Sequence, residues 1–151
     1  MIRLASNIFN SHQDPMQLDV NDSVIERLLL LHPSCMQEHI DGDGPVIWVL
    51  LIPTTMELMK QFINSEISET ALLDQTPLNI KYETLYLCSV MVLKEFRHQG
   101  LATNLTREAI KKIRADHPIQ SLFVWPFTKE GNALAFKIAK EEKLPLFKRE
   151  S

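Results

Sequence analysis

The chain has 151 residues, of which 45% are hydrophobic and 23% are charged, and its formal net charge is −3. This length suffices for one domain with its own hydrophobic core, so we expect residues 1–151 to form a single domain. Because the Lys and Arg residues are scattered rather than clustered, neither nucleic acid nor a membrane is an expected partner.

The cysteine content and the hydropathy pattern favour the cytoplasm. Cys35 and Cys88 are the only cysteines, which is too few for a disulfide framework, and they lack the spacing of a zinc site. The longest apolar run, residues 46–53, is too short to cross a bilayer, and the amino terminus lacks the layout of a signal peptide. We therefore expect a cytoplasmic protein without a bound metal.

The amino-terminal region is predicted to be helical. A short helix within residues 1–11 and a turn at 12–15 are expected first. A second helix is predicted over 22–31, with Asn21 as its cap. It ends at His32-Pro33, because the residue before a proline disfavours the α conformation.

The next segment contains one predicted strand and two predicted helices. Asp and Gly residues indicate a loop at 41–45, which leads into a strand at 46–52. Thr54 or Thr55 caps one helix, and Ser68 caps a shorter one that reaches about residue 75.

The most informative stretch is an apolar strand that turns at a glycine into an amphipathic helix. Residues 85–93 are almost uninterruptedly apolar, as in a strand covered on both faces. After Gly100, apolar residues recur every four positions as far as Ile113. This layout points several free backbone N–H groups at one spot, with the positive end of the helix dipole behind them. It therefore predicts an anion site, most often one for phosphate.

Strands and helices continue to alternate toward the carboxyl terminus. A strand is expected at 119–126, a helix begins near Asn132, and residues 144–148 are predicted to form a closing strand. This alternation from residue 46 onward predicts an α/β fold, with a mixed central sheet, flanking helices and a helical amino-terminal region.

The turn also carries a resemblance to a known family. Arg97-x-x-Gly100-x-Ala102 resembles the Gln/Arg-x-x-Gly-x-Gly/Ala pattern of the GNAT acyltransferase superfamily, with the strand and helix that this pattern requires. Asn132-Ala133-Leu134-Ala135 is similar to the family's Asn-x-x-Ala helix start. The resemblance covers roughly residues 84–149 and implies a GNAT-like fold with acetyl-CoA as co-substrate.

The resemblance implies how acetyl-CoA is bound. Backbone N–H groups of the turn would hold the pyrophosphate, main-chain groups of the preceding strand would pair with the pantetheine arm, and an asparagine side chain would reach the cofactor. The expected cofactor-binding residues are Val90, Met91, Val92, Arg97, His98, Gln99, Gly100, Leu101, Ala102, Thr103 and Asn132.

The implied reaction is transfer of the acetyl group to an amine of a small molecule or peptide, with a backbone N–H near Val92 stabilising the oxyanion. Many family members carry a glutamate on the central strand, where this chain has Tyr86, and a tyrosine where this chain has Ala139. Tyr86 and Ser89 are therefore the catalytic candidates, beside Glu83 or a water chain. Since the unperturbed pKa of tyrosine is about 10, the Tyr86 hydroxyl is expected to hold a water or the acceptor amine.

Several alternatives remain open on the sequence. A non-catalytic GNAT-like domain that binds CoA or a partner protein is the second functional hypothesis, because no general base or acid is evident. The family also leads into its central strand with an antiparallel strand pair, whereas only one strand is predicted here. Cys88 is expected to be a core residue. Asp41, Asp43, Glu66, Glu69 and Asp74 are expected on the surface, either presented to a cationic amine or simply solvated. Trp125 is expected either at a structural corner or in the wall of the acceptor pocket.

Overall fold

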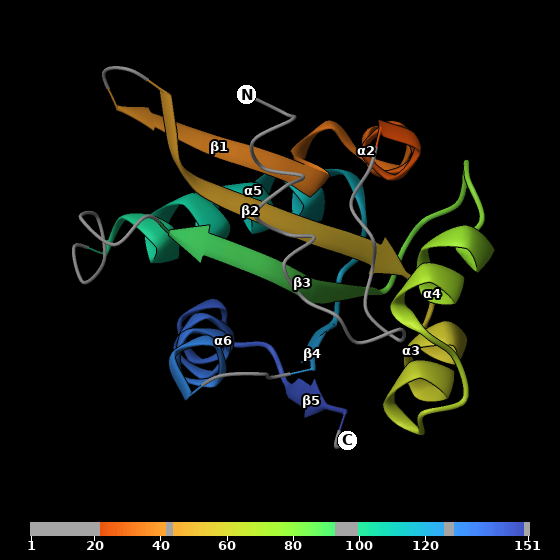
Figure 1. Cartoon of the computed structure of the whole chain (residues 1–151). Helices are drawn as coiled ribbons and strands as arrows, with labels where there is room; N and C mark the ends of the chain where they lie inside the picture. The colour runs from red at the N-terminus through yellow and green to blue at the C-terminus, as the bar shows by residue number, and fades with distance from the viewer. Residues whose placement is uncertain (1–21, 42–43, 93–99, 126–128, 150–151) are drawn as a thin grey trace.

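The computed structural model describes residues 22–41, 44–92, 100–125 and 129–149, and for residues 41, 44–45, 89–92 and 129–131 it describes the backbone alone. The predicted helix at 1–11 and the turn at 12–15 lie outside these ranges. No described helix is both long and apolar enough to cross a membrane. The elements in chain order (Figure 1) are α2 (Asp22–Leu31), the short 3-10 helix η1 (Pro33–Cys35), β1 (Met36–Asp41), β2 (Gly44–Thr54), α3 (Met56–Ile63), α4 (Glu69–Gln75), β3 (Thr84–Val92), α5 (Leu101–Asp116), β4 (Ser121–Val124), α6 (Lys129–Glu142) and β5 (Leu146–Lys148).

The five strands form one mixed sheet in the order β1-β2-β3-β4-β5. The pairs β1–β2 and β2–β3 are antiparallel, whereas the pairs β3–β4 and β4–β5 are parallel. Parallel neighbours need a long crossover, and α5 and α6 supply the two that are required here. The predicted α/β fold with a mixed central sheet and flanking helices is confirmed, as is the long helix between strands β3 and β4.

Strand β1 is the main difference from the sequence-based expectation. It is an edge strand whose several polar residues do not form the apolar pattern that indicates a strand. Its pairing also has a register shift between His39 and Ile40. Its pairing with β2 provides the antiparallel strand pair that the sequence analysis did not find. The predicted loop at 41–45 is correspondingly shorter, because Asp41 already pairs with Gly44.

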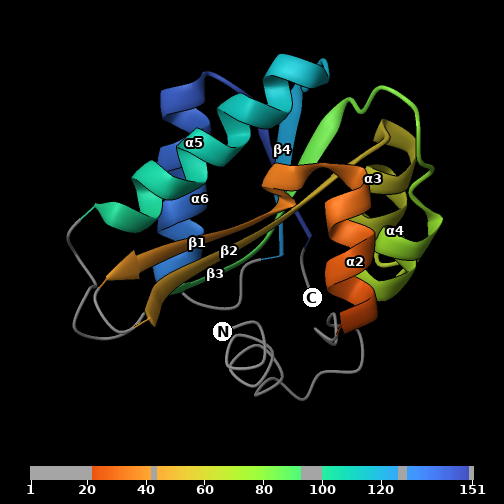
Figure 2. The ribbon, with the colours of Figure 1, turned by 90° about the horizontal axis from the view of Figure 1, so that it is seen from above.

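Helices α3 and α4 begin at the caps that the sequence predicts. Thr55 Oγ1 accepts a hydrogen bond from the Leu58 N–H at 3.2 Å, and Ser68 Oγ accepts one from the Ala71 N–H at 3.1 Å. Figure 2 shows α5 on one side of the strands and α3 and α4 toward the other. The side chain of Tyr86 points to the α3 and α4 side, so these helices determine its surroundings.

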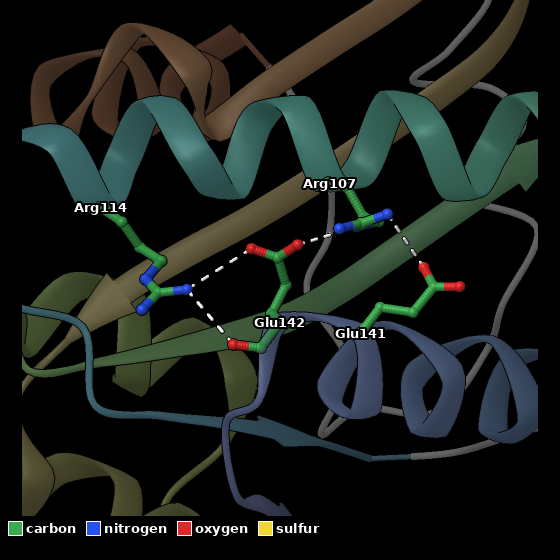
Figure 3. Close-up of polar contacts among 4 residues, drawn as sticks. All are labelled: Arg107, Arg114, Glu141 and Glu142. Carbon is green, nitrogen blue, oxygen red and sulfur yellow. Dashed lines mark hydrogen bonds and ion pairs between the residues drawn. The ribbon is translucent and has the colours of Figure 1, made fainter.

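Helices α5 and α6 are joined by ion pairs between two arginines and two glutamates (Figure 3). Arg107 Nε donates to Glu142 Oε2 at 2.8 Å, and its Nη1 lies 3.2 Å from Glu141 Oε2. Arg114 Nη1 lies 3.5 Å from Glu142 Oε1. The Glu142 side chain is only 5% exposed, whereas that of Glu141 is 35% exposed. The two helices that follow β3 and β4 are therefore held at a set distance from each other.

We expect Glu142→Gln to lower the midpoint of thermal unfolding more than Glu141→Gln does. Glu142 is nearly buried and faces both arginines, so its loss leaves two guanidinium groups without their shared partner, whereas an exposed ion pair contributes little. Thermal unfolding followed by circular dichroism measures the difference. Equal midpoints for the two variants would contradict the assignment of Glu142 as the residue that joins the helices.

Candidate functional site

The candidate site begins where β3 and β4 separate. Strand β3 pairs with β2 from Thr84 to Val92, but with β4 only from Thr84 to Tyr86. We call the point where this pairing ends the strand fork. Beyond it, the β4 side of β3 has no partner strand among the described residues, so its main-chain N–H and C=O groups face an open edge. An extended amide-containing ligand can pair with such an edge as an added strand does.

A β-bulge lies beside the strand fork. Leu50 of β2 pairs with Ser89, whereas the next residue, Leu51, pairs with Leu87. Cys88 is therefore the extra residue on β3. A bulge bends its strand and turns the following backbone groups in a new direction, so the open edge is reoriented just where β4 leaves it.

The glycine turn has the predicted geometry at its described end. Gly100 has φ +75° and ψ 0°, a left-handed conformation that favours glycine, and α5 starts at the next residue. A Cβ built on Gly100 would meet no atom within 4 Å, so the space beside it is open. The helix has no side-chain cap, and its first intrahelical bond runs from the Asn104 N–H to the Gly100 carbonyl. Its first-turn N–H groups thus have no acceptor within the helix.

The structure describes the remaining predicted cofactor-binding residues to different extents. Leu101 and Ala102 are half-buried against the core, and Thr103 is buried. Main-chain atoms of 90–92 lie on the open edge of β3, while residues 97–99 lie outside the described ranges. Asn132 is the fourth residue of α6, and its buried Oδ1 finds no hydrogen-bond donor among the described residues. Because buried polar atoms are nearly always paired, this oxygen is a candidate ligand contact.

Tyr86 is fully buried at the strand fork. Its ring stacks on Phe123 with centroids 4.9 Å apart and contacts Phe62 at 4.8 Å. Its hydroxyl donates a hydrogen bond to Glu69 Oε2. Burial and the Glu69 charge raise the pKa of Tyr86 well above its usual range, so the phenol keeps its proton. The backbone of Ser89, the second catalytic candidate, pairs with Leu50 on the other side of the bulge.

Glu69 is the site residue that the sequence analysis missed. The expectation of a solvated surface acid is wrong, because Glu69 is only 3% exposed and contacts Tyr86 at the strand fork. It lies in the first turn of α4, directly after the Ser68 cap, where an acidic residue is ordinary in a surface helix. No local pattern therefore distinguishes it, and only the packing of α4 against the sheet places it in the interior.

Arg149 adds a positive charge to the same region. Its guanidinium lies 4.1 Å from the ring centroid of Trp125 and 4.6 Å from that of Phe62. Its Nη1 donates to the Ile67 carbonyl at 2.8 Å, two residues before Glu69. Trp125 is therefore buried beside a cation rather than open to solvent, which agrees with a structural corner.

Cys88 is a partly buried thiol in this arrangement. Its Sγ lies 3.9 Å from Glu69 Oε2, and burial together with that negative charge raises its pKa well above the usual range. Burial likewise raises the pKa of Cys35. Since the thiolate is the reactive form of cysteine, neither side chain is a nucleophile at neutral pH.

We expect iodoacetamide to leave both cysteines of the native protein unmodified over a period in which the chain unfolded in guanidinium is fully alkylated. Their raised pKa values keep the thiolate fraction of each very small at neutral pH. Intact mass spectrometry measures the number of adducts. Rapid modification of Cys88 in the native protein would show that this thiol is neither buried nor protonated.

Comparisons with known proteins agree with this geometry. A family model described as the acetyltransferase (GNAT) family matches residues 61–137. Among solved structures, the crystal structure of Chaetomium thermophilum Naa20 in complex with a bisubstrate analogue is similar, with a TM-score of 0.54 and 16% sequence identity. That match covers 91% of this chain and 63% of the other, and at such low identity it shows the fold alone. No curated protein matches the sequence. Because the family model covers just over half of the residues, the chain belongs to the GNAT acetyltransferase family.

Proposed function

We propose that this protein is an N-acetyltransferase that transfers the acetyl group of acetyl-CoA to an amine of a small molecule or peptide in the cytoplasm, with residues 1–151 acting as one domain. The observation that carries the proposal is the open edge of β3, which begins at the strand fork and leads toward the uncapped start of α5 at Gly100. A cofactor with an amide-containing arm and a pyrophosphate group matches these two features in this order along the chain.

The residues present fit acetyl-CoA. The open space at Gly100 allows a phosphate to approach the main chain, and the first-turn N–H groups of α5 lack acceptors within the helix. The Asn132 Oδ1, which finds no donor within the described part of the chain, offers an acceptor at the start of the next helix. In this proposal the arm contacts the main chain of Val90, Met91 and Val92, and the pyrophosphate contacts that of the turn residues Arg97, His98, Gln99, Gly100, Leu101, Ala102 and Thr103.

The chemistry that acetyl-CoA supplies is an activated acyl group, the thioester. The main chain of β3 orients this group, and a backbone N–H near Val92 stabilises the negative charge that develops on its carbonyl oxygen. The bulge at Cys88 turns these backbone groups beside the strand fork. Tyr86 and Ser89 lie on either side of that bulge, so both stay proposed contributors to catalysis.

The second hypothesis, a domain that binds CoA or a partner without turnover, predicts a different outcome in solution. A domain that binds CoA without turnover predicts binding of acetyl-CoA in calorimetry, as the transferase does, whereas a domain that binds only a partner does not. Only the transferase releases free CoA thiol when amines are supplied. Membership of an acetyltransferase family and the retained glycine turn favour the enzyme. An acetyl-CoA titration followed by a panel of amines with thiol detection decides between them.

We expect Gly100→Val to weaken CoA binding at least tenfold, equivalent to roughly 1.4 kcal/mol. A valine would fill the space that the phosphate needs and would also be strained at φ +75°. Asn79→Val is the matched control, because Asn79 has φ +63° on an exposed loop away from the turn. Isothermal titration calorimetry on both variants measures the effect. Equal affinity of wild type, Gly100→Val and Asn79→Val would remove the turn from the binding site.

We expect Asn132→Ala to lower acetyl-CoA affinity by about three- to tenfold, which corresponds to one hydrogen bond of roughly 0.7–1.4 kcal/mol. The buried oxygen has no donor among the described residues, so its removal should cost the free protein little. Asn104→Ala, on an exposed position of α5, is the control and should bind like the wild type. An unchanged dissociation constant for Asn132→Ala would exclude this contact.

A further inference from the structure

A carboxylate lies buried at the strand fork, where the sheet opens. Glu69 comes from the first turn of α4, and the Ser68 cap fixes where that helix begins. Its Oε2 accepts the hydrogen bond of Tyr86 at the last residue of β3 that pairs with β4. The same oxygen lies 3.9 Å from the Sγ of Cys88, the bulge residue. Two independent contacts thus place one carboxylate oxygen beside the point where β3 turns away from β4.

The groups that face Glu69 keep it in position as an acceptor. Tyr86 and Cys88 approach it from β3, and Arg149 lies nearby after β5, bound to the carbonyl of Ile67 and stacked on Phe62. A buried carboxylate is costly unless it is hydrogen-bonded, and the Tyr86 hydroxyl meets that need. Tyr86 and Cys88 both retain their protons, so neither is able to accept one. The carboxylate is therefore the basic group among these side chains.

We propose that Glu69 is the catalytic base of this protein and that Tyr86 is a positioning residue that holds its carboxylate; the proposal rests on the acetyl transfer proposed above. The amine nitrogen forms a bond to the acetyl carbon while the carbon–sulfur bond breaks and its electron pair goes to sulfur. Before this attack a protonated amine loses one proton to a carboxylate oxygen of Glu69, which later releases it to solvent. The second nitrogen proton passes through water to the thiolate, which leaves as the CoA thiol. In this arrangement the carboxylate comes from α4 rather than from the central strand.

The decisive test compares two acceptors of similar size in the variant Glu69→Gln. Methylamine is protonated at neutral pH and must lose a proton before it attacks, whereas hydroxylamine is largely uncharged. We expect Glu69→Gln to lower kcat/KM for methylamine by about a hundredfold or more, in the range of a lost general base, and to lower that for hydroxylamine far less. Glu66→Gln removes an equal charge from an exposed position in the same segment and should match the wild type with both amines.

The variant Tyr86→Phe tests the positioning role. It retains the ring that stacks on Phe62 and Phe123 but removes the hydroxyl that stabilises the charged form of Glu69. Loss of that hydrogen bond raises the pKa of the carboxylate, so the acidic limb of the kcat/KM profile should move to higher pH. A role in packing alone would lower turnover without moving this limb. Acetyl-CoA affinity, measured by calorimetry, should stay at the wild-type value in both variants.

The outcomes separate this inference from the proposed function. Equal losses for the two amines in Glu69→Gln, or no loss with either, would overturn the assignment of the base while leaving acetyl transfer intact. An acidic limb that stays in place in Tyr86→Phe would overturn the positioning role. A wild-type protein that binds acetyl-CoA yet acetylates no amine would contradict the proposed function, and this inference with it.

Discussion

The incomplete pairing of β3 is the constraint on which the candidate site depends. This strand pairs with β2 from Thr84 to Val92 apart from the bulge at Cys88, whereas among the described residues only Thr84, Leu85 and Tyr86 pair with β4. Unpaired main-chain groups in a protein interior are costly, so an open edge in the middle of a sheet needs another partner. The helices that follow β3 and β4, and the side chains at the strand fork, determine what surrounds this open edge.

The helices that follow β3 and β4 are joined to each other by ion pairs. Helix α5 leaves from the glycine turn at the far end of β3, and α6 begins close after β4. Arg107 and Arg114 of α5 bind Glu142, the last residue of α6, so the ion pairs join the carboxyl-terminal end of α6 to α5. The amino-terminal end of α5 has first-turn N–H groups without an acceptor in the helix, and that of α6 has the Asn132 Oδ1, which finds no donor among the described residues.

The sequence predicted local features well where one residue type dictates the backbone. Gly100 adopts the positive φ that a strand-to-helix turn requires, and the Thr55 and Ser68 caps start their helices as expected. The sequence-based predictions were wrong where contacts between distant segments determine the structure. The edge strand β1 is stabilised by pairing with β2 rather than by an apolar pattern, and Glu69 is buried by the docking of α4. A residue's own neighbours in the chain contain no signal for either outcome.

At the position where the resemblance led us to expect a glutamate, the chain has Tyr86, and the structure places a carboxylate beside it from another element. A carboxylate on a fully covered strand needs a donor beside it, and here the roles are reversed, since the strand supplies the donor and α4 supplies the carboxylate. Phe62 and Phe123 contact the ring of Tyr86 and help to hold it where its hydroxyl reaches Glu69. Helices α3 and α4 lie between β2 and β3 in the chain, so this one connecting segment provides both Phe62 and Glu69. A shift of the segment between β2 and β3 would therefore alter both the packing around Tyr86 and the position of the Glu69 charge at the strand fork.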